Sequence, residues 1–381
     1  MNENRHYSLT KSDSFIGKLI FNKYRIIERI GKGSFGCIYK AIYKKKFYAI
    51  KFEEKKEEKY LQTIINEAYC MNNVKGPYVP YVKMYGSTDT HIFLIMELMG
   101  KSLEQLFNEN QRKFSIRCVC NIGYQMIEIL EFIHNKNIIH QDMKPDNFVI
   151  GLNDKKKYIY LLDFGLARRY KSPNTNRHYP LKEYEHMVGT SRYASINAMV
   201  AYSQSRRDDL EAIGYIFIYF LKGSLPWQGI AAKTKQEKNR KIVDKKKQTS
   251  AEELCDYLPR QFADYINYTR KLEYEQDPDY NYLRNLLVSV LNLYGYNFDC
   301  YYDWDTDTII YNRNNFVDKQ NINDIGKSDL NNNSNFGKIN DTENINTNKS
   351  NNNNLNTNTI KKEVNLNYKV PKKNCECCII Y

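Results

Sequence analysis

Apolar and polar positions follow two different patterns along the chain. From about residue 24 to about residue 98 they alternate as in β-strands, and the one clear helix in this region carries Glu67 in the run Ile64-Ile65-Asn66-Glu67-Ala68. Beyond Gly100 the apolar positions recur at helical spacing, as from Cys120 to Leu130 and again around Ala212 to Leu221. The two patterns predict an α+β fold with a β-rich N-terminal lobe and a helical C-terminal lobe.

The C-terminal end of the chain follows neither pattern. From about Asn312 the sequence is rich in asparagine and loses its apolar periodicity. Such a segment cannot bury enough apolar surface to offset the loss of chain entropy on folding, so we expect it to be disordered. The predicted organisation is an N-terminal extension (1–23), one domain (24–310) with lobes at about 24–98 and 99–310, and a low-complexity tail (311–381).

The composition agrees with one packed domain. The chain has 381 residues, of which 42% are hydrophobic and 14% aromatic, enough for a sizeable core. The apolar run from Ile213 to Leu221 is much shorter than the roughly 20 residues of a membrane span, so it indicates a buried central helix.

We expect no secretory signal, because Met1 to Thr10 is polar, and no N-myristoylation, because the chain does not start with Met-Gly. Six scattered cysteines fit a reducing cytoplasm and indicate no disulfide framework.

A glycine-rich motif, Gly31-Lys32-Gly33-Ser34-Phe35-Gly36, lies between two β-rich runs, Tyr24 to Ile27 and Cys37 to Tyr39. In dinucleotide-binding folds the same spacing must open a helix. Between strands it favours a flexible hairpin over the phosphates of ATP, because glycines let backbone N–H groups approach the oxygens without a Cβ in the way.

A lysine on the next strand is the expected phosphate ligand. Lys51 ends the run Tyr48-Ala49-Ile50-Lys51, and Glu67 on the following helix is its expected partner. Four nearer glutamates, of which Glu53 is the first, are mixed with lysines between residues 53 and 59. That mixture is typical of a solvated loop or helix start, so we select Glu67.

The predicted hinge between the lobes is Met96-Glu97-Leu98-Met99, directly after the strand His91 to Ile95. Its backbone would pair with adenine, and Met96 would close the back of the pocket. A buried Met after a strand more often belongs to the hydrophobic core than to a ligand pocket. The position of Met96 in the order of the kinase motifs favours the pocket. The residues predicted to line the ATP site are Ile30, Gly31, Gly33, Ser34, Phe35, Gly36, Ile38, Ala49, Lys51, Glu67, Met96, Glu97 and Leu98.

The stretch from His140 to Asn147, followed by Asp163-Phe164-Gly165, carries the remaining chemistry. It supplies a carboxylate that can accept a hydroxyl proton, an amide and a second carboxylate that can hold Mg²⁺, and a lysine between them. Each motif alone is weak, but four motifs in this order indicate a kinase that uses ATP and Mg²⁺.

Further segments indicate which family of kinases the chain resembles. Most protein kinases close the activation segment with Ala-Pro-Glu, whereas this chain has Tyr193-Ala194-Ser195-Ile196-Asn197. With Ser205 to Glu211, Gly223 to Gly229 and Pro278 to Arg284, it resembles the casein kinase 1 family from about residue 20 to about residue 310. The resemblance implies a two-lobed serine/threonine protein kinase that favours acidic or phosphate-primed protein substrates.

The resemblance also implies residue roles. Asp142 would be the catalytic base, Lys144 would stabilise the transferring phosphate, and Asn147 and Asp163 would hold Mg²⁺. Lys51 and Glu67 would form the ion pair that positions ATP. Asp209 would anchor the catalytic loop from below, and an ordinary surface acid is the competing interpretation.

The resemblance places a substrate anion site at Arg192 and Lys238. An Arg matches a phosphate bidentately and a Lys acts as a point charge, although Lys238 lies in a basic stretch (233–247) that is typical of a solvated helix face.

A second family anion site has changed in this chain. Gln141 replaces the usual Arg before the catalytic Asp, Glu185 replaces a Lys, and Arg168 remains. Control by activation-loop phosphorylation is therefore not expected, because Gln141 cannot supply a charge-assisted bond to phosphate. We hypothesise a narrower or altered preference for acidic substrates.

The formal net charge of +13 admits acidic proteins, nucleic acid or anionic lipid as partners. No specific nucleic-acid module accompanies the charge, so acidic protein substrates are the economical explanation. We expect a cytoplasmic monomer, and the sequence leaves a nuclear location open.

The last seven residues contain Cys375, Cys377 and Cys378 after lysine-rich segments. Cys378 opens a C-a-a-X sequence with an atypical final Tyr, and the other two cysteines are candidate palmitoylation sites. Lipid chains combined with a basic patch give stable anchoring, so association with an anionic membrane surface is one expectation. Unmodified thiols or a loose metal-ligand set are the alternatives, although a structural zinc site needs four fixed ligands.

Two other functions stay open. A pseudokinase would bind ATP without transferring phosphate, and its mark would be the loss of Lys51, Asp142 or Asp163, all of which are present. A membrane-tethered scaffold would use the domain only to dock partners, and it would be favoured if removing activity left the cellular effect intact.

Overall fold

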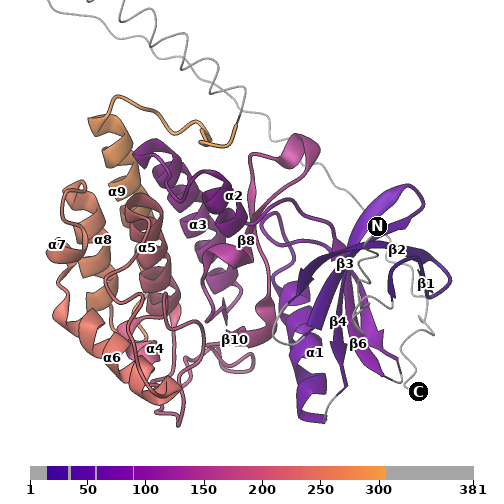
Figure 1. Cartoon of the computed structure of the whole chain (residues 1–381). Coiled ribbons are helices and arrows are strands. Elements are labelled where there is room, and N and C mark those ends of the chain that lie inside the picture. Colours follow the sequence, from indigo (N-terminus) through magenta and orange to yellow (C-terminus); the bar gives the residue numbers. More distant parts are fainter. Residues whose placement is uncertain (1–14, 33–35, 56–57, 89, 306–381) are drawn as a thin grey trace, which may run out of the picture. The chain divides into compact units, whose positions relative to one another are not determined.

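The computed structural model describes residues 15–32, 36–55, 58–88 and 90–305. The expected disorder of the tail and the three C-terminal cysteines lie outside these residues. The N-terminal lobe is an antiparallel sheet of six strands in the order β1-β2-β3-β4-β6-β5, with one helix beside it (Figure 1). The strands are β1 (Leu19–Ile20), β2 (Tyr24–Lys32), β3 (Gly36–Tyr43), β4 (Lys46–Glu54), β5 (Val82–Ser87) and β6 (His91–Glu97), and the helix is α1 (Glu58–Asn73).

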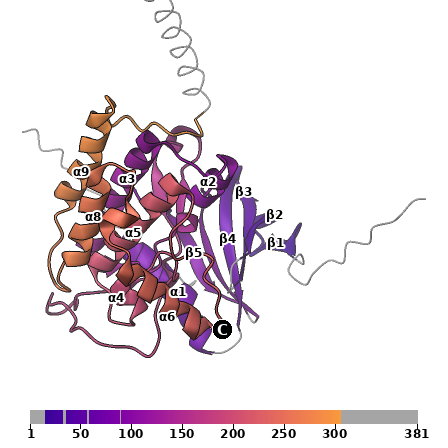
Figure 2. The same ribbon diagram turned by 60° about the vertical axis from the view of Figure 1, so that its left-hand side comes forward.

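The C-terminal lobe is mainly helical (Figures 1 and 2). Its helices are α2 (Leu103–Glu109), α3 (Ile116–Asn135), α4 (Ile196–Met199), α5 (Arg206–Lys222), α6 (Lys235–Gln248), α7 (Ala251–Leu254), α8 (Arg260–Lys271) and α9 (Tyr280–Leu293). Short strands pair β7 (Ile138–Ile139) with β10 (Arg168–Arg169) and β8 (Phe148–Ile150) with β9 (Ile159–Leu161), and the 3-10 turns are η2 (Pro145–Asn147), η3 (Asn153–Lys155) and η4 (Phe164–Leu166). The predicted two-lobed α+β fold is confirmed.

Both faces of the N-terminal sheet are covered. Alternation along β4 places Ile50 and Phe52 in a cluster on one face, whereas Ala49 packs in the larger core with α1. Phe15 stacks on Phe52 with ring centroids 4.7 Å apart, and β1 pairs with β2. The sheet therefore begins before the predicted boundary at residue 24, because a single aromatic ring and a two-residue strand give no periodic signal.

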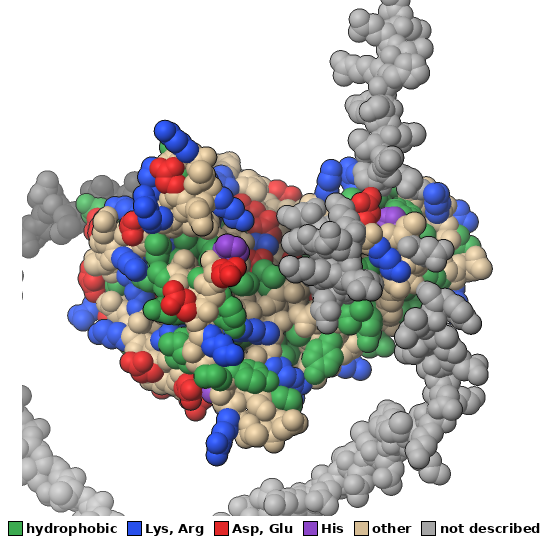
Figure 3. Space-filling view, turned by 90° about the horizontal axis from the view of Figure 1, so that it is seen from below, with side chains coloured by type: hydrophobic (Ala, Val, Ile, Leu, Met, Phe, Trp, Pro, Cys, Tyr) green, Lys and Arg blue, Asp and Glu red, His purple; other side chains and the backbone are tan. Residues whose placement is uncertain are grey.

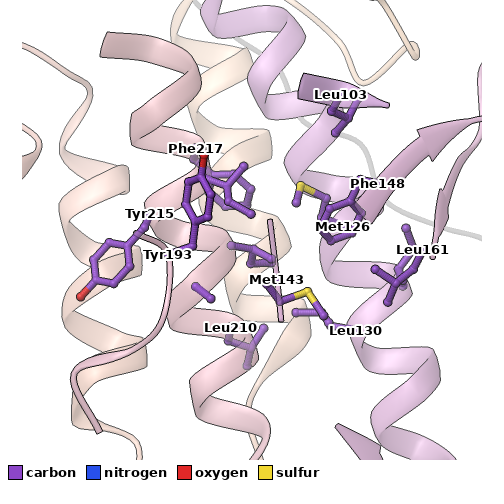
Figure 4. Close-up of a cluster of buried hydrophobic side chains, with 14 of the residues drawn as sticks. Leu103, Met126, Leu130, Met143, Phe148, Leu161, Tyr193, Leu210, Tyr215 and Phe217 are labelled. Carbon is purple, nitrogen blue, oxygen red and sulfur yellow. The ribbon is translucent and has the colours of Figure 1, made fainter. Parts of the chain in front are cut away.

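Helix α5 occupies the centre of the C-terminal lobe, against α3 and α8. Its apolar stretch is buried on all sides, which explains why the sequence there is apolar without being a membrane span. Among the described residues, no helix combines the length and apolar character that a bilayer crossing requires. Figure 4 shows Met143 of the catalytic loop within this core, near Leu130 of α3 and Leu210 of α5.

The segment after α9 packs back on α3. The guanidinium of Arg117 lies 4.7 Å from the ring centroid of Tyr296 and 4.3 Å from that of Tyr301. The hydroxyl of Ser115, at the start of α3, donates to Asp303 at 2.7 Å. This irregular segment is therefore a packed part of the domain.

Candidate active site

Lys51 links the two lobes of the site. Its Nζ lies 2.8 Å from Oε2 of Glu67 on α1 and 3.4 Å from Oδ1 of Asp163, which belongs to the C-terminal lobe. The predicted partners are therefore brought together, and Glu67 is 1% exposed. Burial acts to lower the pKa of Lys51, but the neighbouring carboxylates outweigh it and raise the pKa, so Lys51 stays cationic.

Glu53 corrects one sequence prediction. It lies on β4 rather than in a solvated loop, and it is 3% exposed, with Oε1 3.4 Å from the Nζ of Lys51. Burial raises the pKa of Glu53, and it raises that of Glu67 to about 7, although Lys51 opposes both shifts. Lys51 thus faces three carboxylates, and strand alternation places Glu53 on the same side of β4 as Lys51.

The glycine-rich hairpin has the predicted position. Gly31 on β2 pairs with Ile38 on β3. A Cβ on Gly36 would lie 1.9 Å from the carbonyl oxygen of Phe52, so this close strand contact requires glycine. Gly33, Ser34 and Phe35 at the tip lie outside the described residues.

The remaining residues predicted to line the nucleotide site lie on β2, β4 and β6 and on the connection to the C-terminal lobe. Ala49 pairs with Met96 across β4 and β6, and both are largely buried. Strand β6 runs on through Glu97, two residues beyond the predicted strand, so the connection begins at Leu98. Ile30 on β2 is exposed. Their contact with adenine stays a prediction.

The catalytic loop presents one buried carboxylate between two donors. Asp142 is 7% exposed, its Oδ2 accepts a hydrogen bond from Lys144 at 2.5 Å, and its Oδ1 accepts one from the Thr190 hydroxyl at 2.7 Å. The side-chain amide of Asn147 donates to the carbonyl of Asp142 at 2.8 Å. A carboxylate held this way keeps a fixed orientation while both oxygens stay able to accept a proton.

Gly189 allows the activation segment to approach this loop. Its φ is +100°, and a Cβ there would lie 2.4 Å from the carbonyl oxygen of Gln141. Any other residue would both strain the backbone and collide with the catalytic loop. The glycine therefore permits Thr190 to reach Asp142.

Asp209 holds the catalytic loop from behind. Its carboxylate accepts the backbone N–H groups of His140 at 2.8 Å and of Gln141 at 2.9 Å, and lies 3.1 Å from Nε2 of His134. Burial acts to raise the pKa of Asp209, but the hydrogen bonds from the His134 side chain and the His140 backbone help to outweigh it, and the pKa is lowered. The carboxylate therefore stays ionised, and its contacts match the anchoring role rather than that of a surface acid.

Asp163 and Asn147 offer the donor types that Mg²⁺ prefers. Burial acts to raise the pKa of Asp163, yet Lys51, His140 and Lys144 together lower it, so this side chain is a carboxylate. Because the amide nitrogen of Asn147 donates to the catalytic loop, its side-chain oxygen is the atom that can face a cation. Among the described residues, no group of three or more His, Cys, Asp or Glu could hold a metal. Mg²⁺ is usually held by one or two protein oxygens together with substrate phosphates, and Asp163 and Asn147 could supply such oxygens.

The loop that contains Arg192 is held by side chains of Trp227 and Lys246. The indole nitrogen of Trp227 donates to the carbonyl of Arg192 at 2.7 Å, and Lys246 donates to the carbonyls of Ser191, at 3.0 Å, and of Ala194. Lys246 is fully buried and departs from the solvated face predicted for the basic stretch, whereas Lys238, Arg240 and Lys247 are exposed as predicted. Burial lowers its pKa to about 7, although Glu211 opposes this shift.

The three predicted anion-site residues differ in their surroundings. The guanidinium of Arg192 lies 5.6 Å from the ring centroid of Tyr193, and Lys238 is exposed on α6. Arg168 donates to the hydroxyl of Tyr184 at 2.9 Å. Within the described part of the chain, none of the three forms an ion pair with a carboxylate.

Comparison with known families agrees with this geometry. The model of the protein kinase domain matches residues 24–291, which include the glycine-rich hairpin, Lys51, the catalytic loop and Asp163. The match spans both lobes and most of the chain. The chain therefore belongs to the protein kinase family.

Proposed function

We propose that this protein kinase is a casein kinase 1-like serine/threonine kinase that acts on acidic or phosphate-primed proteins. The observation that best supports an active enzyme is a pair of contact sets. Asp142 contacts Lys144 and Thr190, and Lys51 contacts Asp163. This arrangement provides a proton acceptor, a cation for the transferring phosphate and a cation for the remaining phosphates.

Each group has a distinct task in the proposed reaction. Asp142 accepts the proton of the substrate hydroxyl, and Lys144 stabilises charge on the phosphate as it moves. Mg²⁺, when bound, neutralises charge on the phosphates of ATP, and Asn147 and Asp163 would hold it. Lys51 would fix the nucleotide phosphates, and Glu67 keeps the lysine in place.

Two alternatives are less well supported. A pseudokinase has no need for the Asp142 cluster, and a scaffold has no need for the Lys51 contacts. Membrane attachment through Cys375, Cys377 and Cys378 stays a prediction, since these cysteines lie outside the described residues.

Replacing Arg192 with glutamine should reduce the preference for a primed substrate. The kcat/KM ratio between a phosphoserine-primed peptide and its unprimed match is expected to fall on the order of tenfold, because a charge-assisted bond to phosphate is lost. The unprimed kcat should stay the same. Arg240→Gln, an exposed arginine on α6, is the matched control and should keep the wild-type ratio. An unchanged ratio in the Arg192 variant would remove Arg192 from the anion site.

Acidic and neutral peptides test the second anion site, in which Glu185 replaces a lysine. Glu185→Lys should raise kcat/KM for acidic peptides more than for neutral ones, because the exposed carboxylate no longer repels an acidic group. Identical peptide profiles for wild type and variant would contradict the hypothesis.

A further inference from the structure

A cavity of about 660 Å³ lies beside the connection between the two lobes. It is formed by the start of β4, the start of β5, the connection itself and the loop that contains η3. Of the residues predicted to bind ATP, only Glu97 and Leu98 contribute to its wall. The catalytic residues Asp142 and Asp163 do not line it, so this cavity is separate from the reaction centre.

The wall of the cavity is basic. Lys45, Lys46, Lys83 and Lys155 line it, and all four are exposed. Glu97 is one of two acids in the wall, and its carboxylate is paired with Lys155 at 3.2 Å. On the face shown in Figure 3, by contrast, basic and acidic side chains are interspersed. The excess of lysines gives the cavity a positive potential that favours an anionic ligand.

Exposed apolar side chains lie in the same wall. Phe47, Tyr81 and Leu152 are 48%, 51% and 39% exposed. Two further lysines lie over the rings: Lys40 is 5.1 Å from the centroid of Phe47, and Lys75 is 5.3 Å from that of Tyr81. An occupant that combines acidic groups with an apolar side chain would satisfy both features.

The turn that leads into β4 keeps lysine at an unfavourable backbone position. Lys44 and Lys45 both have left-handed φ values, 48° and 61°, at the tip of the β3–β4 hairpin. Such two-residue turns usually contain asparagine and glycine, which adopt this conformation readily. The lysines thus occupy positions that backbone geometry does not favour, beside a cavity that their charge suits.

We propose that this cavity binds an acidic segment with an apolar anchor, located on a protein substrate away from its phosphorylated residue. The proposal rests on the proposed function, since it supplies a docking site for the acidic substrates of this kinase. Lysines would pair with the carboxylates, and the apolar residue would contact Phe47 and Leu152. Leu152 beside the lysines suits a peptide with an apolar side chain better than a nucleic-acid backbone, which has no such group.

Binding can be measured without catalysis. The probe is a fluorescein-labelled peptide, Asp-Glu-Glu-Leu-Glu-Phe-Asp-Glu, which has no phosphorylatable residue, titrated with the full chain in the absence of ATP. The double variant Lys45→Glu and Lys83→Glu is expected to weaken binding by at least about tenfold, because like charges then oppose the peptide. Phe47→Ala should weaken it by about threefold, since apolar contact is lost while charge is unchanged.

A matched control separates docking from overall charge. Lys247→Glu with Lys271→Glu makes the same change in net charge at exposed positions of the C-terminal lobe and should leave the affinity unchanged. Equal weakening by both double variants would overturn the proposal in favour of long-range attraction. Tighter, Lys45- and Lys83-dependent binding of a labelled single-stranded oligonucleotide would overturn it in favour of nucleic acid. Equal binding of a peptide with glycine in place of Leu and Phe would overturn the apolar anchor.

A kinetic comparison separates this proposal from the proposed function. With the acidic segment joined by a linker to an acceptor peptide, the Lys45 and Lys83 variant should raise KM about tenfold, and the acceptor peptide alone should keep its wild-type kcat and KM. Loss of activity on both substrates would contradict a docking role. Failure of the proposed function would instead appear as absent transfer by wild type while the ATP-free titration still showed Lys45-dependent binding.

Discussion

Replacing Asp142 with asparagine is expected to lower kcat by roughly 10³-fold, within the range for losing a general base. Asparagine has the same size: its one side-chain oxygen can keep the hydrogen bond from Lys144, and its NH₂ group can donate to the Thr190 hydroxyl, which can rotate to accept. It cannot take a proton from the substrate hydroxyl. The fold, the melting temperature and the affinity for ATP should therefore stay close to wild type.

The test combines steady-state kinetics with a nucleotide titration. Asp146→Asn is the matched control, because Asp146 is an exposed acid in the same loop and should keep wild-type kcat. If Asp142→Asn kept most of its activity while Asp146→Asn did not, the assignment of the base would be wrong. A variant that no longer bound ATP would show that Asp142 acts through structure instead.

The second large effect is expected at Asp209, where asparagine should lower both stability and kcat. Its carboxylate accepts two backbone N–H groups and contacts His134. In asparagine an NH₂ group replaces one oxygen and would face a donor, leaving buried N–H groups unsatisfied. We expect a loss of about 3 kcal/mol in unfolding free energy, or a melting temperature lower by on the order of 10 °C. The catalytic loop would lose its anchor, so kcat should fall at least tenfold in protein that is still folded.

Thermal unfolding measures the loss of stability, and kinetics below the melting temperature measure the loss of kcat separately. Asp279→Asn is the control, because Asp279 caps α9 at the surface and asparagine caps helices equally well. It should change neither quantity appreciably. Wild-type stability and activity in Asp209→Asn would contradict the anchoring role.

Much of this site could be predicted because phosphoryl transfer restricts which residues can serve. Asp142 and Lys51 were identified from their motifs, and the structure places each beside the partners that the chemistry requires. The choice of Glu67 over nearer glutamates also agrees with the observed contact. Helices α3 and α5 were visible from their apolar spacing, which is the strongest local signal a sequence carries.

The missed features depend on packing between distant segments. Glu53 and Lys246 are buried charged residues in lysine-rich stretches, and local composition favours exposure for both. Their burial follows from contacts with Lys51 and with the loop around Arg192, which sequence spacing does not reveal. Alternation in the run Lys51-Phe52-Glu53 could have placed Glu53 on the same side as Lys51. The segment after α9 is irregular, so its packing on α3 left no periodic signal.

The measurement that tests the central claim most directly is transfer of the γ-phosphate from Mg-ATP to a serine peptide, with Asp163→Asn as the control. Asparagine keeps the shape of Asp163 but loses the charge that faces Lys51 and would hold Mg²⁺. The account predicts steady transfer by wild type and almost none by Asp163→Asn, with both proteins folded. No transfer by folded, ATP-binding wild type, or equal transfer by the two proteins, would contradict it.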